Sequence, residues 1–233
     1  MSQPLSAAAR AEARAILLAD PRFQAMPTER LARLIDAGEW RLLPADARLF
    51  SAGDESRAVL AVASGFLAFD SALTVPEVPL FNFGPAPFWS VGRPQVQGRI
   101  RLVTATARTP LTVLSIPITR FEALEARDPL VRDFKAMIVA QIFLDTLEAL
   151  ADALIPAIPQ RAVTTLLRIA GRKHGGDAPV TVPISQVEFS ALTNVSRQTC
   201  GEWLRSIERE GLIRLGYRRI ELLSPAGLRA KIP

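Results

Sequence analysis

The sequence contains one cysteine and one histidine among its 233 residues. A disulfide, a thiolate zinc site or a cysteine-ligated iron–sulfur cluster within one chain needs several sulfur atoms, so Cys200 alone excludes all three. His174 alone excludes most histidine metal sites and nearly all catalytic triads that need a histidine. We therefore expect no metal site and no enzymatic activity, and the sequence leaves any cofactor unknown.

Long apolar runs are also missing. The longest weakly polar stretch, Ala58 to Phe69, includes Ser64 and Gly65 and falls short of the roughly 20 residues that a membrane-spanning helix needs. The N-terminal part carries Glu12 and an apolar run, Ala15 to Ala19, that is too short for a signal peptide. We therefore expect no membrane association and a cytoplasmic location.

The charge is unevenly distributed along the chain. Residues 157–233 contain 12 lysines and arginines against 6 acidic residues, whereas residues 1–156 contain 16 against 17. The net charge of +5 thus comes from the last third. This asymmetry is typical of a chain with a nucleic-acid-binding domain at one end. The length fits two modest domains, at roughly 100 to 150 residues each.

The first two regions of the chain differ in their apolar pattern. From Pro4 to Leu43 the spacing is helical, whereas from Arg48 to Pro117 short alternating runs are broken by glycine and proline. The second pattern predicts a small β-barrel or roll. Its clearest strands are expected at Leu49–Phe50, Val59–Val62, Phe66–Phe69 and Leu111–Ile116.

A long helix is predicted from Pro129 to Leu154. Apolar residues recur there at steps of three and four: Leu130, Phe134, Met137, Ile138, Ile142, Leu144, Leu147, Leu150 and Leu154. Phe143 makes the stripe wider than a single seam. The helix can pack on its own barrel, on an identical helix of a second chain, or on both. Pro156 and Pro159 end it, because proline lacks the amide donor, and we place the domain boundary there.

The last third predicts a winged helix-turn-helix. Ser185 and Glu188 have the spacing of a capping box, which starts a first helix. The pattern breaks at Asn194–Val195 and restarts at Ser196, a second N-cap residue, in a helix that ends at Gly211. The segment Leu212–Leu223 then predicts a hairpin, the wing, which turns near Gly216–Tyr217.

One face of the second helix is suited to DNA. A helical wheel places Cys200, Trp203, Leu204 and Ile207 on the core side and Gln198, Glu202, Arg205 and Arg209 opposite, with Arg197 on the flank near the N-terminus. Arginine can contact guanine, glutamine can contact adenine, and glutamate can accept from cytosine. Ser196 and Thr199, beside the free amides of the helix start, are suited to phosphate. The alternative is an ordinary solvated polar face.

The run from Ile184 to Arg214 resembles the helix-turn-helix of the Crp/Fnr family of bacterial transcription regulators. In that family the recognition helix begins Ser-Arg-Glu-Thr-Val-Gly-Arg or close to it, and here Ser196 to Glu202 reads Ser-Arg-Gln-Thr-Cys-Gly-Glu. The resemblance implies base-reading roles for Arg197, Gln198 and Glu202 and phosphate contacts for Ser196 and Thr199. Gln and Glu replace the common Glu and Arg, so the operator of the catabolite activator type cannot be carried over.

The resemblance spans the chain, because the family also has a cyclic-nucleotide-binding-like β-roll followed by a long dimerisation helix. It implies an α+β fold with three parts: a jelly-roll-like, double-stranded β-roll sensor-like domain with N-terminal helices at 1–125, a dimerisation helix at 126–156 and a winged helix-turn-helix DNA-binding domain at 157–233. The implied partners are double-stranded DNA, a second copy of the chain and RNA polymerase.

The effector site departs from the family pattern. Cyclic-nucleotide binders have Phe-Gly-Glu followed about ten residues later by Arg, the Glu holding the ribose and the Arg the cyclic phosphate. The corresponding residues are Phe88, Trp89 and Ser90, then Arg101. The Glu has become Ser90 and the Gly has become Trp89, so we expect no binding of cAMP. Other members of the family bind an iron–sulfur cluster through four Cys, or haem through a Cys or His of the roll. This sequence lacks those ligands.

Three further features have competing interpretations. His174 with Asp177 could suggest acid–base chemistry, but both are predicted in a glycine-rich surface turn. Cys200 could sense oxidants if exposed, but its wheel position predicts a buried residue. Four aromatic residues could line an apolar effector pocket or simply fill the roll: Phe81, Phe83, Phe88 and Trp89.

We therefore predict a sequence-specific, homodimeric DNA-binding transcription regulator that acts on an inverted-repeat operator. Arg218 and Arg219 of the wing are expected to contact DNA phosphates. The main rival is a regulatory module whose roll binds a small molecule and whose basic tail contacts DNA non-specifically. The sequence gives neither the effector nor the operator, nor the choice between activation and repression.

Overall fold

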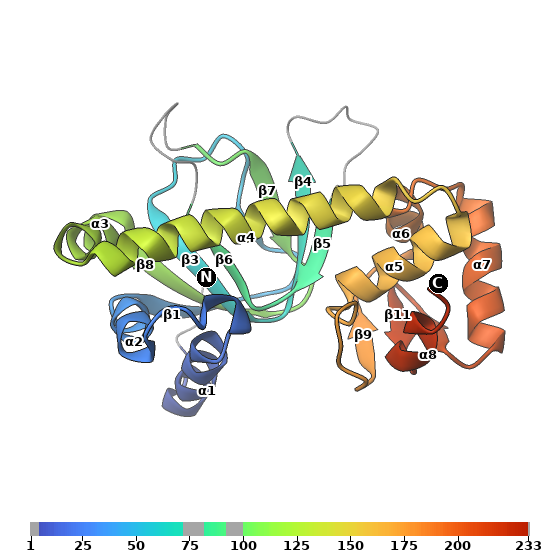
Figure 1. The fold of residues 1–233 in the computed structure, drawn as a ribbon, viewed down its shortest axis with the longest axis horizontal. Coiled ribbons are helices and arrows are strands. Elements are labelled where there is room, and N and C mark those ends of the chain that lie inside the picture. The colour runs from blue at the N-terminus through green and yellow to red at the C-terminus, as the bar shows by residue number, and fades with distance from the viewer. Residues whose placement is uncertain (1–4, 72–81, 92–99, 233) are drawn as a thin grey trace. The chain divides into compact units, whose positions relative to one another are not determined.

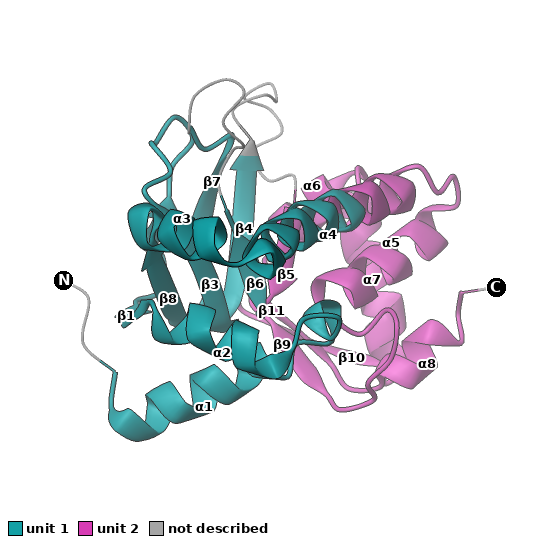
Figure 2. Cartoon of the chain, turned by 60° about the vertical axis from the view of Figure 1, so that its left-hand side comes forward, with its two compact units in different colours: residues 1–73, 86–145 teal, residues 74–85, 146–233 magenta. Residues whose placement is uncertain are grey.

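The structure is a computed structural model that describes residues 5–71, 82–91 and 100–232. It divides into two compact units, residues 1–73 with 86–145 and residues 74–85 with 146–233 (Figure 2). The division falls inside one long helix, α4 (Pro129–Ala153), which contributes residues to both units. Within the described ranges, no helix is both long enough and apolar enough to cross a membrane.

The first unit is a β-roll covered by helices (Figure 1). Its helices are α1 (Ala7–Leu18), the short 3-10 helix η1 (Pro21–Phe23), α2 (Thr28–Asp36), α3 (Ile118–Arg127) and the first part of α4. Its strands are β1 (Glu39–Leu43), β2 (Arg48–Phe50), β3 (Ala58–Ser64), β4 (Phe66–Ser71), β6 (Phe88–Ser90), β7 (Val103–Ala107) and β8 (Leu111–Pro117). One antiparallel sheet has the order β1-β8-β3-β6, and β2, β7 and β4 are neighbours in another.

The central strand β3 explains how the unit is held together. All five of its inner residues are buried, because side chains alternate between the helix-covered face and the interior of the roll. Val59, Ala61 and Ala63 belong to a core cluster with residues of α1, α2, α3 and α4. Leu60 and Val62 therefore face the interior of the roll. A strand buried on both faces reads as a continuous apolar run, which is the pattern in the sequence.

Two elements of the first unit differ from the predicted pattern. The helical spacing predicts helix as far as residue 43, but residues 39–43 form strand β1. The helical interpretation is wrong because Trp40 pairs with Leu114 and Leu43 with Leu111, and these long-range ladder contacts override a weak local pattern. Helix α3, which follows Pro117 directly, was not predicted.

The second unit is a winged helix-turn-helix (Figure 1). It contains β5 (Asn82–Pro85), the end of α4, α5 (Ile158–Ile169), β9 (Val180–Val182), α6 (Gln186–Leu192), α7 (Arg197–Arg209), β10 (Ile213–Gly216), β11 (Arg219–Leu222) and α8 (Pro225–Arg229). The strands β9, β10 and β11 form an antiparallel sheet of order β10-β11-β9. Pro159 lies in the first turn of α5, where its missing amide breaks no helical hydrogen bond.

The predicted fold class is confirmed: the chain is α+β, with a β-roll, a long helix and a winged helix-turn-helix. The individual domain limits of 125/126 and 156/157 stay predictions.

Candidate nucleic-acid interface

Helix α6 starts at the predicted capping box. The Ser185 hydroxyl accepts a hydrogen bond from the Glu188 amide at 3.2 Å, and the Glu188 carboxylate accepts from the Ser185 amide at 2.9 Å. The helix ends at Leu192, and Asn194 then adopts a positive φ of 50°. Asparagine is one of the few residues that tolerate this left-handed conformation. It turns the chain sharply enough for the N-cap of a second helix, Ser196, to follow two residues later.

Helix α7 starts at Ser196, whose hydroxyl accepts from the Thr199 amide at 3.0 Å. Its inner face is formed by Cys200, Leu204 and Ile207, all buried, and Trp203 stacks on Phe189 of α6 with ring centroids 6.2 Å apart. This packing fixes α7 against α6. The opposite face is left to solvent.

The predicted base-reading residues share that solvent face. Arg197, Gln198 and Glu202 are all exposed, and so are Arg205 and Arg209 farther along the helix. The Gln198 amide donates to the Glu202 carboxylate at 3.0 Å, which holds these two side chains next to each other. In the described part of the chain, no carboxylate pairs with Arg197. The helix thus presents a guanidinium, an amide and a carboxylate in its first two turns.

The wing is fixed to the same helix. The Leu215 amide of β10 donates to the Glu208 carboxylate of α7 at 2.7 Å. Glu221 pairs with both Arg214 and Arg219, at 3.2 and 3.1 Å. Because Glu208 belongs to the last turns of α7, the hairpin is held beside the C-terminal half of the helix.

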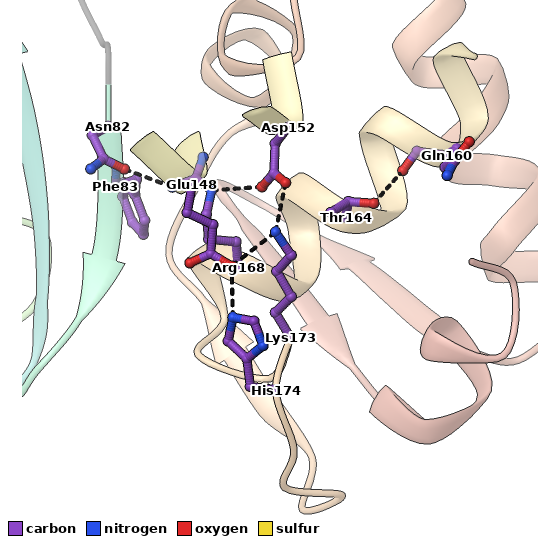
Figure 3. A network of polar contacts seen from close by, with 9 residues as sticks. All are labelled: Asn82, Phe83, Glu148, Asp152, Gln160, Thr164, Arg168, Lys173 and His174. Atoms are coloured by element: carbon purple, nitrogen blue, oxygen red, sulfur yellow. Dashed lines mark hydrogen bonds and ion pairs between the residues drawn. The ribbon is translucent and has the colours of Figure 1, made fainter. Parts of the chain in front are cut away.

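A buried polar network ties the end of α4 to α5 and to the turn after it (Figure 3). Asp152 accepts from Arg168 at 2.8 Å and from Lys173 at 2.7 Å. Arg168 also donates to Asn82 at 2.8 Å, and Glu148 contacts Lys173 at 2.9 Å. Sequence reasoning missed this network, because its partners lie 16 to 86 residues apart and have no common motif.

The comparisons agree with this geometry. A family model described as the Crp-like helix-turn-helix domain matches residues 160–231. The structure of FixK2 from Bradyrhizobium japonicum is similar with a TM-score of 0.66 at 15% identity, over 84% of this chain and 98% of that one. Residues 160–231 are thus similar to a Crp-like helix-turn-helix domain, and the chain has the fold of Crp/Fnr transcription regulators.

Two further solved structures have a similar fold. The c-di-GMP responsive global regulator CLP from Xanthomonas campestris has a TM-score of 0.63 at 17% identity, over 84% of this chain and 99% of that one. A transcriptional regulator of the CRP family from Thermus thermophilus has a TM-score of 0.60 at 19% identity, over 82% and 97%. No curated protein matches the chain.

In the β-roll, Arg101 is buried and its guanidinium hydrogen-bonds to other residues of the chain. Its guanidinium donates to the Ser90 hydroxyl at 2.5 Å and to the Ala58 carbonyl at 3.0 Å, and it lies 4.4 Å from the centroid of the Phe50 ring. Burial lowers the pKa of Arg101 to about 10, against a smaller raising effect of Asp54. The arginine therefore stays charged at neutral pH, held by neutral oxygens and a ring face.

The Trp89 side chain lies apart from Ser90 and Arg101, the other residues aligned with the effector site of the family. The indole lies on the helix-covered face of β6, with Phe23 at 6.0 Å and Phe134 at 5.0 Å between ring centroids. Neighbouring residues of a strand face opposite sides, so Ser90 faces the interior of the roll instead. The expected aromatic cluster is likewise divided, because Phe88 packs on Phe69. Phe81 lies outside the described residues.

The remaining candidates are also resolved. Cys200 is buried, and burial raises the pKa of its thiol to about 11, so the interpretation as a small core residue is confirmed and an oxidant-sensing thiolate is not. His174 contacts Glu148 at 2.7 Å, while Asp177 pairs with Arg229. These separate partners give no support to the disfavoured alternative of acid–base chemistry by His174 and Asp177.

Proposed function

We propose that the chain is a DNA-binding transcription regulator of the Crp/Fnr type that recognises a specific sequence as a homodimer, with α7 in the major groove of each half-site. Arg197, Gln198 and Glu202 read bases, and Ser196 and Thr199 contact phosphate at the helix start. Arg218 and Arg219 of the wing contact phosphates of the DNA backbone. The observation that carries the proposal is the solvent face of α7, where three side chains with base-specific hydrogen-bonding geometry lie together.

The exposed stripe of α4 supports the homodimer. Val131, Phe134 and Ile138 in the first part of the helix are buried in the core of their own unit. Farther along, Phe143 is 64% exposed and Leu154 is 70% exposed. The large exposed apolar residues in this part of the chain are Val139, Ile142, Phe143, Leu144, Leu147, Leu150 and Leu154. Among them, Phe143, Leu147, Leu150 and Leu154 recur at steps of four, three and four, a spacing typical of a helix that packs on a second helix.

A dimer explains why the operator is expected to be an inverted repeat. Two identical chains related by a two-fold axis present two α7 helices in opposite directions. Such dimers bind half-sites about one helical turn of DNA apart. The partner copy thus doubles the number of bases that the protein can read.

The first prediction is that the protein sediments as a dimer at micromolar concentration and that Leu147→Glu makes it a monomer. The substitution places a charge in the centre of the stripe, where a second helix would have to bury it. The control is Ala11→Glu, which adds the same charge at an exposed position of α1, away from the stripe. Analytical ultracentrifugation distinguishes the outcomes. A wild-type monomer at this concentration would refute the homodimer.

The hydrogen bonds that Arg101 makes within the protein support the proposal that the roll does not bind cAMP. In the cyclic-nucleotide binders that the sequence resembles, a glutamate holds the ribose, and Ser90 stands at that position. Here Ser90 and the Ala58 carbonyl take hydrogen bonds from the guanidinium that a cyclic phosphate would need. A phosphate would have to displace both and would find no ribose anchor.

The second prediction is that isothermal titration calorimetry detects no binding of cAMP, and that cAMP leaves the affinity for DNA unchanged. Because two donors of the Arg101 guanidinium already bond within the protein, an added phosphate would have to replace those bonds, and the net gain in free energy is small. Micromolar affinity for cAMP would overturn this part of the proposal. In that case Arg101→Ala should abolish the binding.

The rival proposal is a small-molecule module whose basic tail holds DNA without reading its sequence. It predicts that affinity depends on salt but not on sequence. A regulator that also engages RNA polymerase would fit either proposal, so that partner does not separate them. Measurement of DNA affinity across sequences does.

A further inference from the structure

The tip of the wing carries the most exposed large hydrophobic residue in the described part of the chain. Tyr217, the sole tyrosine of the sequence, is 90% exposed in the turn between β10 and β11. A single exposed aromatic side chain is common in proteins and means little by itself. Three further features of the hairpin indicate that this exposed ring has a binding role.

The backbone of the turn is the first feature. Arg218 follows Tyr217 with a positive φ of 53°. Glycine is the residue that adopts this conformation without steric cost, and it is the usual choice in hairpin turns. An arginine there keeps a long cationic side chain at a position where a glycine would relieve strain. Unusual backbone conformations of this kind are concentrated at functional sites.

The charge at the tip is the second feature. Arg214 and Arg219 share the carboxylate of Glu221. Among the described residues, Arg218 has neither an ion pair nor a hydrogen-bonding partner. The phenol ring of Tyr217 therefore stands next to an uncompensated guanidinium, which favours a strongly anionic partner.

The rigidity of the hairpin is the third feature. Four residue pairs join β10 to β11, and β11 also pairs with β9. The bond from the Leu215 amide to Glu208 fixes the hairpin to α7 itself. When α7 lies in a major groove, the tip is carried beside that groove in a fixed position. The next groove along the duplex is the minor groove.

We propose that Tyr217 enters the minor groove that flanks each half-site and gives the protein a preference for A·T pairs there. This inference rests on the proposed function of α7. Arg218 contacts the phosphates at the edge of this groove. The minor groove is about 6 Å wide, which admits a single aromatic ring projecting from the hairpin tip. A·T pairs present only acceptors there, to which the phenol hydroxyl can donate, whereas G·C pairs add the projecting amino group of guanine.

The test uses the selected operator with three versions of its flanks, containing A·T, G·C or inosine·C pairs. Inosine lacks the minor-groove amino group of guanine but keeps its major-groove edge, so the inosine·C flank isolates minor-groove recognition. For the wild type, we expect the G·C flank to weaken binding by about tenfold and the inosine·C flank to restore it. For Tyr217→Ala, the three flanks should bind equally. Tyr217→Phe separates the hydroxyl from the ring.

The outcomes separate this inference from the proposed function. If half-site bases affect binding but all three flanks bind the wild type equally, the inference about Tyr217 is wrong and the role of α7 stands. Equal discrimination by the wild type and Tyr217→Ala also overturns it. If Tyr217→Ala changes transcription by RNA polymerase but not DNA affinity, the ring contacts protein and the inference fails. If no position of the DNA affects binding, the proposed function itself fails.

Discussion

Replacement of Arg197 by alanine is expected to lower the affinity for the operator by about 1–3 kcal/mol per half-site, or roughly 5- to 150-fold. Ser196 caps α7, so Arg197 occupies its first helical position and lies in the turn that would enter the groove. Its guanidinium can donate two parallel hydrogen bonds to guanine O6 and N7. The substitution should relax the preference at one base pair in each half-site. Fluorescence anisotropy with the operator and with random duplexes measures both effects.

Arg218→Ala is the matched control for Arg197→Ala. It removes the same charge from the same unit, but at the wing, where the proposed contact is a phosphate. Phosphate contacts act on every sequence alike, so the affinity should fall for operator and random DNA together. The slope of log affinity against log salt concentration should decrease by about one for each phosphate that is no longer bound. If Arg197→Ala weakens binding in this same uniform way, α7 reads no sequence.

The second large effect is expected from Asp152→Ala, which should destabilise the second unit by about 3–5 kcal/mol. The Asp152 side chain is 3% exposed and lies between Arg168 and Lys173. Without it, the nearly buried Arg168 keeps only the Asn82 oxygen as a partner among the described residues, whereas Lys173 keeps Glu148. Removal of one member of a buried ion cluster strongly destabilises the fold, because it leaves a buried charge without its partner. This holds even where the intact cluster stabilises the fold no more than apolar residues would. Hydrogen exchange of the α5 amides measures the stability of this unit.

Asp177→Ala provides the comparison, since Asp177 also pairs with an arginine but its side chain is 73% exposed. Exposed ion pairs contribute about 0–1 kcal/mol. The protection of α5 should therefore change little in this variant. Equal destabilisation in the two variants would mean that the network in Figure 3 does not hold the end of α4 to α5.

The helix-turn-helix could be predicted closely from sequence because its signals are local. The capping box at Ser185 and Glu188 and the N-cap at Ser196 start helices through bonds across three residues, and they lie at the predicted positions. The solvent face of α7 follows from the same helical geometry. Arg197, Gln198 and Glu202 therefore lie on the predicted face, although their contacts with bases stay a proposal.

The roll was predicted less completely because its contacts join distant residues. Strand β1 exists through its pairing with β8, about 70 residues away, and its own sequence gives a weak signal. The direction of Trp89 depends on the register between β6 and β3, in which Trp89 lies opposite Ala61. A shift of one residue would exchange the faces of Trp89 and Ser90. The sequence alone does not fix that register.

The central claim is that α7 reads a DNA sequence from a homodimer, and selection of bound duplexes from a random pool tests it most directly. The full-length protein is mixed with random DNA at a salt concentration near the physiological one, and the bound fraction is sequenced. The account predicts an inverted repeat whose half-site centres lie about 10 base pairs apart, with the preference at one position of each half-site abolished in Arg197→Ala. Tight binding with no enriched sequence would contradict it.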